Sequence, residues 1–390
     1  MRQPYCSLTP AAVTDLARAA LARALPWRPY RRSVSAADLL DLVLLTAALA
    51  SSLWAVVRRF AFGFSHETAR KALAANLPDP ARLAGGLADA LHGLVPRAFR
   101  RRPKDIAVDR HDVPFYGKPG TPGVLGGPKK GGTHRAFAYA TAAAVHRGQR
   151  WCLGLVRLTG NDPESAVLAV LAQLRARGVR IRSLVLDRGF FSGHLILALQ
   201  RRGVPFVVGV PRRPGRWDRL FARPSGRVAT LSWKTDRGRR PVSVPVVRAC
   251  RRLGGRWRRE LYAFGGLCPG QAVGRHRRAR FYRERMRRRF GIETSYRQMN
   301  QGKALTTSAD PRRRLLWLGV ALLLRQAWVW WQRALAGRRC NWSGWRPQEE
   351  LTLAVLLGWL AGALAQRHPA AEEIPLPRPV GSPFHEPAGC

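Results

Sequence analysis

Acidic residues are scarce in this sequence. Only 23 of its 390 residues are Asp or Glu, against 68 Lys and Arg, and the formal net charge is +45. A chain with so few acids needs a polyanion to balance its charge, which points to DNA, RNA or an anionic membrane surface as the partner. Only seven of the basic residues are lysine, and Ala, Gly, Pro and Arg are abundant, as a GC-rich genome would produce. Codon bias explains the preference for arginine but not the lack of acids.

Cysteines are few and scattered. The six thiols form no CxxC pair and no Cys/His spacing of a zinc site, so the sequence argues against a disulfide scaffold and structural zinc and predicts reduced thiols in a cytoplasmic protein. The first ten residues, MRQPYCSLTP, lack the apolar core of a signal peptide.

Long apolar runs are also limited. The stretch Leu315–Trp331 carries Arg325 and Gln326 in its middle, and Leu351–Ala365 has 15 residues, fewer than the ~20 needed to span a bilayer. We therefore expect buried helices here and no membrane-spanning segment.

Residues 1–100 read as a helical N-terminal domain. The run Asp38–Phe60 is apolar over several helical turns and opens on Asp38, a suitable helix cap. In residues 63–73, Ser65 can cap a short helix that exposes Glu67, Arg70 and Lys71. This turn and basic helix resemble a helix-turn-helix recognition element, in which Arg70 and Lys71 would contact DNA; a solvated helix on a bundle fits equally well.

From residue 101, strands and helices alternate. Strands are expected at 105–117, 135–146, 150–160, 179–187 and 204–211, a Gly/Pro loop at 118–134, and helices at 161–178 and 192–203. The first helix has Asp162 as its cap, Pro163 in its first turn and Gly178 at its end, and the second opens on Ser192. The first three strands can form an antiparallel meander, and the later ones can pair in parallel through crossovers. This order is the pattern of the ribonuclease H-like fold.

Residues 212–270 interrupt this alternation. They read as a basic β-strand insertion between a first core part, 101–211, and a second, 271–340. Between residues 212 and 289 there are 25 basic and four acidic side chains, an excess that is hard to hold together without a polyanion. Residues 341–390 are expected to be a helix followed by a disordered Pro-rich tail. The predicted class is therefore α/β: a ribonuclease H-like mixed sheet with a β-rich insertion, preceded by a helical domain.

Three acids stand out by position. Asp109 ends the first core strand, Asp187 ends the fourth, and Glu293 lies in the helix after the insertion. If those two strands are neighbours, the helix can bring Glu293 over the pair. Converging carboxylates repel each other unless a divalent cation neutralises them, and Mg²⁺ is the hard ion that suits carboxylate oxygens. Two such ions about 4 Å apart can activate a water or a 3′-hydroxyl and stabilise the leaving oxygen in phosphodiester displacement; Mn²⁺ could substitute.

The same segments carry a family resemblance. IAVDRHDVPFYG, LVLDRGFFSG and YRERMRRRFGIETSYRQM resemble the three acidic signature blocks of DDE insertion-sequence transposases, in the group built around insertion sequence family four. The intervals of 78 and 106 residues between the acids leave room for the β-strand insert of that group. The resemblance covers about residues 105–335. It implies that Asp109, Asp187 and Glu293 are the catalytic acids that hold the metal ions.

The resemblance also implies DNA contacts near the cleaved phosphate. Arg289, four residues before Glu293, matches the family's arginine. The family's tyrosine would fall at Met286, with Tyr282 and Tyr296 nearby, and its lysine at Asn300, with Lys303 the nearest substitute. The predicted DNA-binding residues are Arg188, Arg289, Tyr296, Arg297, Lys303, Lys129, Lys130, Arg70 and Lys71.

Each acid has a structural alternative, which is an ion pair with a nearby arginine. The alternatives are Asp109 with Arg110 (leaving Asp112 as the ligand), Asp187 with Arg188, and Glu293 with Arg289 or Arg297.

These features predict a DNA transposase. It would bind terminal inverted repeats, nick the DNA beside them and insert the 3′ ends into target DNA, as a homodimer in the nucleoid. Two other functions remain open: a ribonuclease H-like nuclease without strand transfer, and a catalytically dead or domesticated DNA-binding protein.

Overall fold

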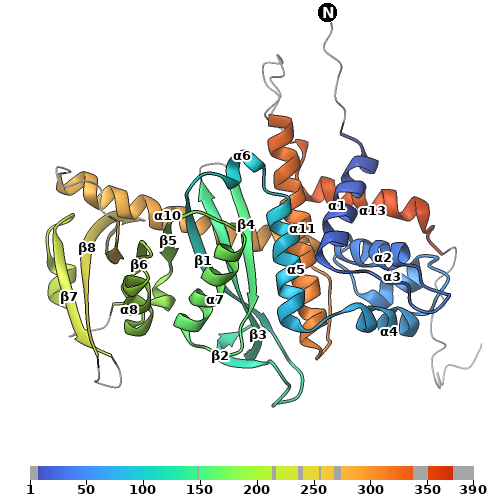
Figure 1. Cartoon of the computed structure of the whole chain (residues 1–390), viewed down its shortest axis with the longest axis horizontal. Coiled ribbons are helices and arrows are strands. Elements are labelled where there is room, and N and C mark those ends of the chain that lie inside the picture. Colours follow the sequence, from blue (N-terminus) through green and yellow to red (C-terminus); the bar gives the residue numbers. More distant parts are fainter. Residues whose placement is uncertain are drawn as a thin grey trace, which may run out of the picture.

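The chain builds a nine-stranded mixed sheet with helices on both of its faces (Figure 1). The computed structural model describes residues 8–146, 149–212, 217–235, 240–253, 256–267, 274–336 and 350–371. The strands are β1 (Lys104–Pro114), β2 (Leu125–Lys130), β3 (Thr133–His146), β4 (Gln149–Arg157), β5 (Ile181–Leu186), β6 (Phe206–Gly209), β7 (Val228–Lys234), β8 (Pro241–Leu253) and β9 (Arg256–Gly265). The longer helices are α1 (Pro10–Ala24), α2 (Ala36–Ala48), α4 (His66–Asn76), α5 (Pro80–Gly93), α7 (Pro163–Ala176), α8 (Gly193–Arg201), α10 (Arg275–Met299), α11 (Pro311–Ala336) and α13 (Leu353–Arg367). Short helices are α3 (Leu53–Arg59), α6 (Arg97–Arg100) and α9 (Asp218–Ala222).

The sheet combines an antiparallel meander with parallel strands. β1 pairs antiparallel with β3, and β3 pairs antiparallel with β4. β5 lies parallel to both β1 and β6, with α7 and α8 in the connections that lead into β5 and β6. The seven predicted strands and helices of this part follow one another as expected, with one additional strand, β2, between the first and the second.

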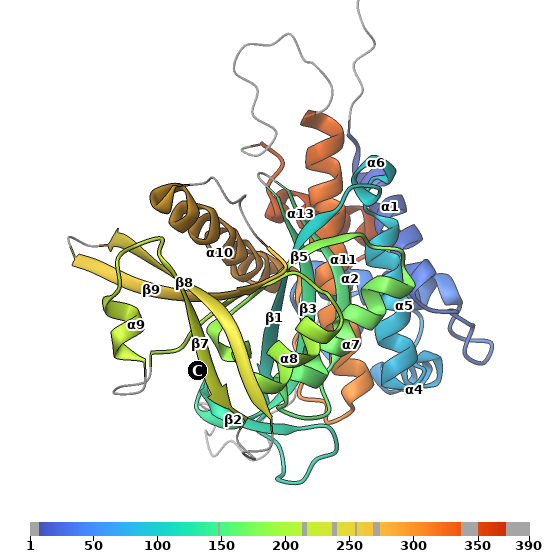
Figure 2. The same cartoon turned by 60° about the vertical axis from the view of Figure 1, so that its left-hand side comes forward.

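The basic strands of residues 212–270 extend this sheet instead of forming a separate layer. β9 pairs antiparallel with β6, β8 with β9, and β7 with β8. Figure 2 shows β7, β8 and β9 together on one side of the molecule, with α9 beside them. The core and the insertion are therefore joined by backbone hydrogen bonds, which fixes the insertion relative to the strands that carry Asp109 and Asp187.

Residues along β1 alternate between two cores. Ile106 and Val108 lie in the apolar cluster that includes residues of α7 and α8, whereas Ala107 lies in the cluster shared with α5 and α11. Asp105 and Asp109 are each two residues from Ala107 along β1, so all three side chains lie on the same face of the strand. They therefore lie on the face that α10 covers.

α10 crosses this second face of the sheet, touching β8, β6, β5, β1 and β3. Its first half packs Tyr282 and Met286 on a small cluster with β5, β6, β8 and β9, and its second half packs Ile292, Tyr296 and Met299 into the main core. One helix thus spans from the insertion to the middle of the core sheet.

The N-terminal helices share one apolar core with α11 and α13. The two polar residues in the apolar run of α11 are hydrogen-bonded inside it. Gln326 accepts from the Cys152 amide at 2.8 Å and donates to the Cys152 and Leu91 carbonyls. Arg325 donates to the Arg150 carbonyl at 2.9 Å. These bonds offset the cost of burying polar groups, and they join α11 to β4 and α5.

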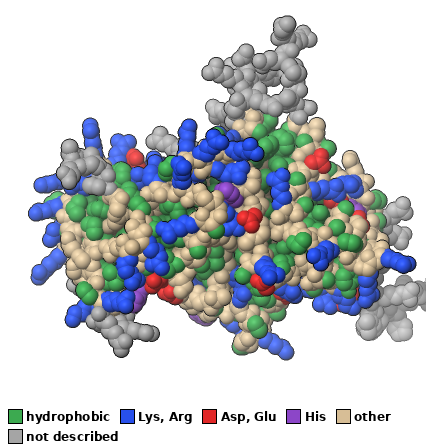
Figure 3. Space-filling model, viewed as in Figure 1, with side chains coloured by type: hydrophobic (Ala, Val, Ile, Leu, Met, Phe, Trp, Pro, Cys, Tyr) green, Lys and Arg blue, Asp and Glu red, His purple; other side chains and the backbone are tan. Residues whose placement is uncertain are grey.

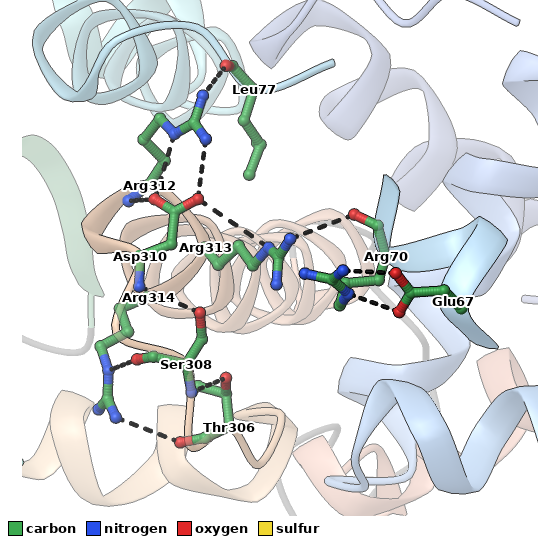
Figure 4. Close-up of polar contacts among 9 residues, drawn as sticks. All are labelled: Glu67, Arg70, Leu77, Thr306, Ser308, Asp310, Arg312, Arg313 and Arg314. Carbon is green, nitrogen blue, oxygen red and sulfur yellow. Dashed lines mark hydrogen bonds and ion pairs between the residues drawn. The ribbon is translucent and has the colours of Figure 1, made fainter. Parts of the chain in front are cut away.

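The beginning of α11 is tied to α4 by a row of arginines (Figure 4). Arg312 forms an ion pair with Asp310 at 2.9 Å and donates to the Leu77 carbonyl at the end of α4. Arg313 donates to the Arg70 carbonyl at 3.2 Å. α4 is therefore held against α11, the helix that contacts β4.

Several local predictions are confirmed at the helix ends. Ser65 caps α4, Asp162 caps α7 with Pro163 following it, and Gly178 takes the left-handed conformation (φ +66°) after α7. Ser192 precedes α8 but makes no side-chain cap hydrogen bond.

Two local predictions are wrong, the helix cap at Asp38 and the loop at 118–134. Asp38 does not cap its helix, because Ser35 is the cap and Asp38 is its partner in a capping box. The same run breaks into α2 and α3, with Ala50 in the left-handed region (φ +46°) between them. The Gly/Pro loop at 118–134 contains β2, whose end at Lys130 pairs with Thr133 across a turn of two glycines.

Within the described ranges, no helix is long and apolar enough to cross a membrane. The two apolar runs lie in α11 and α13, with side chains such as Leu316, Leu324, Leu356 and Leu360 buried in the main core.

Candidate active site

Asp109 and Asp187 lie side by side because β1 and β5 are parallel neighbours. Val108 pairs with Leu186 at the last position of this register, and the two aspartates follow directly. Asp109 does not end its strand, as the sequence suggested, since β1 continues to Pro114 through its pairing with β3. The parallel pairing nevertheless ends at this point, so the two carboxylates emerge at the same edge of the β1–β5 pair.

α10 brings Glu293 to this edge together with Arg289, one helical turn earlier. Arg289 Nη2 lies 3.0 Å from Glu293 Oε1 and 3.3 Å from Asp187 Oδ1, and Nη1 lies 3.9 Å from Asp109 Oδ1. The Arg289 side chain is 5% exposed, whereas those of Asp187 and Glu293 are 40% and 43% exposed. Three carboxylates far apart in the sequence therefore meet around one buried guanidinium and keep a side open to solvent.

The electrostatics of the site favour a further cation. Burial raises the pKa of Asp109 to about 6; Arg289 opposes this, and the nearby carboxylates Asp187 and Glu293 add to it. A single guanidinium does not fully compensate the desolvated Asp109 carboxylate and its two acidic neighbours.

Tyr296 of α10 contacts the backbone of Asp109. Its hydroxyl lies 2.6 Å from the Thr141 hydroxyl and donates weakly to the Asp109 carbonyl at 3.4 Å. Burial and the Asp109 charge raise the pKa of Tyr296 well above its usual value, so the phenol stays protonated. Tyr296 was predicted to contact DNA; it is buried here, and a direct DNA contact would require it to leave this position.

The ion pairs that the sequence left open as structural alternatives for the three acids form in only some cases. Arg110 pairs with Asp112 at 2.7 Å. Side chains alternate along β1, so these two residues lie on the opposite face of the strand from Asp109. Asp187 pairs with Arg289. Glu293 does pair with the arginine one turn before it, but the same guanidinium also binds the other two acids.

A basic groove of about 1220 Å³ opens at Asp187. It runs between α10 and the strand β9, so it joins the carboxylates to the insertion. Arginines that line it include Arg188, Arg212, Arg258, Arg259, Arg283 and Arg287. Arg188 is exposed. This predicted DNA contact therefore lies in the groove among the other arginines that line it.

The predicted DNA-binding lysines form a second group, near the second half of β1. Lys130 is exposed and donates to the Asp112 carbonyl at 3.1 Å, and its neighbour Lys129 is also exposed. Burial, together with Lys130 and Arg314, lowers the pKa of Lys303.

The remaining predicted DNA contacts are Arg297, Arg70 and Lys71. Arg297 is exposed on α10. Arg70 and Lys71 are exposed on α4, where both form ion pairs with Glu67. Figure 1 shows α4 in the helical half of the molecule, away from the insertion.

Arg285 was missed by the sequence reading. It lies one turn before Arg289 on α10, stacks 3.6 Å over the Phe281 ring and lies 3.9 Å from Asp105 Oδ2. Asp105 also pairs with Arg182 of β5. The four-residue spacing shared by Arg285, Arg289 and Glu293 on the helix, and by Asp105 and Asp109 on the strand, is the signal that could have revealed it.

Comparison with known families identifies this arrangement. The family model "Transposase DDE domain" matches residues 100–324, which is more than half of the chain and includes all three acids. The chain belongs to the transposase DDE domain family. This transposase is also similar in fold to a piggyBac transposase in a cryo-EM structure of its synaptic complex with hairpin DNA, with a TM-score of 0.55, 10% sequence identity, and coverage of 93% of this chain and 82% of that one. A comparison with curated proteins found no match.

Membership confirms the predicted class of protein, a DNA transposase, and its ribonuclease H-like α/β fold. DDE transposases as a family depend on divalent metal ions. The donor set of this transposase fits such an ion: three carboxylates, two of them open to solvent, already gathered around a positive charge. In the described part of the chain, no three His, Cys, Asp or Glu side chains lie close enough together to hold a metal as they stand. The Arg289 guanidinium contacts all three carboxylates instead.

Proposed function

We propose that this transposase moves DNA by cutting at element ends and joining the 3′ ends to target DNA, with Asp109, Asp187 and Glu293 as its catalytic acids. The observation that carries the assignment of the acids is their convergence on one guanidinium from two parallel strands and a crossing helix. Asp112 pairs with Arg110 instead, which favours Asp109 as the β1 ligand.

The three carboxylates would hold Mg²⁺, in two ions, with Mn²⁺ able to substitute. Metal bound there would activate the attacking oxygen and stabilise the leaving oxygen of the phosphodiester. The protein's own contribution is orientation. Tyr296 fixes the backbone of Asp109 through its carbonyl, and hydrogen-bonded strands on both sides of β1 keep Asp109 beside Asp187.

The groove between α10 and the insertion is the proposed path of the DNA beside the cleaved phosphate. Its arginines, including Arg188, would contact the phosphate backbone, while the exposed Lys129 and Lys130 would extend the contact along the other side of the acids. Figure 3 displays many Lys and Arg side chains over the insertion end and few acids on that face. Such phosphate contacts predict an affinity that falls steeply with salt.

The N-terminal helices are the proposed end-binding part, with Arg70 and Lys71 of α4 as contacts to the terminal inverted repeats. Support comes from their exposure and from the arginine row that fixes α4 to α11. A homodimer would hold two ends together.

A strand-transfer assay tests this proposal. Purified protein is incubated with Mg²⁺, a DNA fragment carrying the sequence that flanks the gene, and a target plasmid. We expect cleavage at the fragment ends and covalently joined products, both lost in Asp109→Asn. The control Asp112→Asn removes a charge from the same strand outside the cluster and should retain both activities within a few-fold.

Each other outcome has a definite meaning. Metal-dependent cleavage without joined products would identify a nuclease and contradict the transposition proposal. DNA binding without cleavage by the unaltered protein would identify a non-catalytic DNA-binding protein. Equal losses in Asp109→Asn and Asp112→Asn would contradict the assignment of the acids.

A further inference from the structure

Arg289 occupies the centre of the carboxylate cluster. An arginine whose only role is to bind a DNA phosphate is expected to be exposed when DNA is absent, as Arg188 is. Arg289 is instead 5% exposed, and its two terminal nitrogens are directed at Asp109, Asp187 and Glu293. Its Nε is buried without a hydrogen-bond partner, so the contacts of this guanidinium are concentrated on the acids.

The guanidinium and a metal ion would compete for the same oxygens. Arg289 lies 3.0–3.9 Å from one oxygen of each acid, and Mg²⁺ would need those oxygens at about 2.1 Å. Two cations at such separations repel each other strongly in a partly buried site. The side chains of Asp187 and Glu293 are open to solvent, so a metal can reach the cluster from the side opposite the buried arginine.

We propose that Arg289 is a built-in counter-cation, which holds the three acids together without metal and gives way when a divalent cation binds. The inference rests on the proposed role of the acids as metal ligands. A divalent ion carries twice the charge of the guanidinium and coordinates the oxygens directly, so it displaces Arg289 from them. Arg289 therefore acts as a positioning residue: it assembles the site before the metal arrives, and it weakens metal binding.

The neutral variant Arg289→Met tests this with two readouts that need no DNA. The first is the affinity for Mn²⁺, titrated by electron paramagnetic resonance or calorimetry. The second is Tm in EDTA and its rise on adding Mn²⁺. The matched control is Arg285→Met, since Arg285 is partly buried one turn earlier on the same helix and pairs with Asp105 of the same strand, outside the acid cluster.

We expect Arg289→Met to bind Mn²⁺ at least about tenfold more tightly than the unaltered protein, because the ion no longer has to displace a like charge from the three carboxylates. Its Tm in EDTA should fall and its Mn²⁺-induced rise in Tm should be larger. Arg285→Met should lower Tm with and without metal and leave the Mn²⁺ affinity unchanged. Arg289→Lys, which keeps the charge but loses the fork, should lie between Arg289→Met and the unaltered protein in affinity.

Unchanged or weaker Mn²⁺ binding by Arg289→Met would overturn the inference, because a residue that merely shapes the site would have that effect. If Arg289→Met folds only with Mn²⁺, the inference is supported. If it does not fold at all, Arg289→Lys decides: an affinity equal to that of the unaltered protein would overturn the inference. A different result is expected if the three acids do not bind metal at all. In that case Asp109→Asn would leave the Mn²⁺ affinity unchanged in the unaltered protein and in every Arg289 variant.

Discussion

At the residue scale, His111 shows how the surroundings of the site control charge. Its ring lies 4.5 Å from the Tyr296 ring, on the same side of β1 as Asp109, and its side chain is buried. Burial, with Lys303 and Lys130 nearby, lowers the pKa of His111 to about 3. The folded protein therefore keeps this imidazole neutral at pH values where the unfolded chain binds a proton.

This shift predicts a loss of stability in acid. Because the folded pKa is depressed from 6.5 to about 3, the unfolded state binds the extra proton in that window, and stability falls as pH decreases through it. Between pH 6.5 and pH 5 the loss from His111 is about 1.5–2 kcal/mol. His111→Phe keeps an aromatic ring against Tyr296 and should reduce the fall in Tm between pH 7 and pH 5, measured by circular dichroism. The exposed His194 provides the control, and a His111→Phe profile identical to that of His194→Gln would contradict the prediction.

Residue roles were also the hardest feature to predict from the sequence. The order of the three acids along the chain led to their selection, and the structure brings all three to Arg289. The family resemblance selected Arg289, but as a DNA contact. Its contacts with the three acids depend on how α10 is rotated against β1, which no local pattern in the sequence shows. The same holds for Tyr296, which was expected to contact DNA because it lies near Glu293 in the sequence, but whose hydroxyl lies beside that of Thr141.

At the element scale, close backbone packing of helices explains a pair of adjacent glycines in α5. A Cβ on Gly86 would lie 2.0 Å from the Ala24 carbonyl oxygen of α1, whereas one on Gly85 would meet nothing within 4 Å. α1 and α5 approach each other closely at Gly86 only because it has no side chain.

This difference predicts opposite effects of two neighbouring substitutions. Gly86→Ala should destabilise the protein by about 1–3 kcal/mol, since α1 must shift to admit the methyl group. Gly85→Ala should stabilise it by roughly 0.5–1 kcal/mol, since alanine favours the helix. Urea unfolding of both variants measures the two changes, and equal values would show that α1 and α5 do not pack this closely.

Elements with strong end signals were predictable from the sequence. α7 has an aspartate cap, a first-turn proline and a closing glycine, and its bounds agreed closely. β2 was missed because its residues, LGGPKK, have low strand propensity and pair only through contacts with β3. The break between α2 and α3 was missed because both segments are apolar and no Gly or Pro marks Ala50.

At the scale of the whole molecule, the sheet explains why one basic surface serves the site. Backbone pairing of β9 with β6 places the insertion's arginines beside Asp187, and α10 connects the same insertion to Glu293. The composition predicted the polyanion partner but not this continuity, because strand pairing between distant segments leaves no local pattern. The shared core of α1, α5, α11 and α13 likewise could not be inferred from helical periodicity alone.

A crystal of the transposase soaked in Mn²⁺ tests whether Asp109, Asp187 and Glu293 hold divalent metal at one site. We expect an anomalous difference peak with oxygens of these three residues about 2.1 Å away and with Arg289 displaced from them. No peak at the cluster under saturating Mn²⁺, with Arg289 still bound to the three carboxylates, would contradict this expectation.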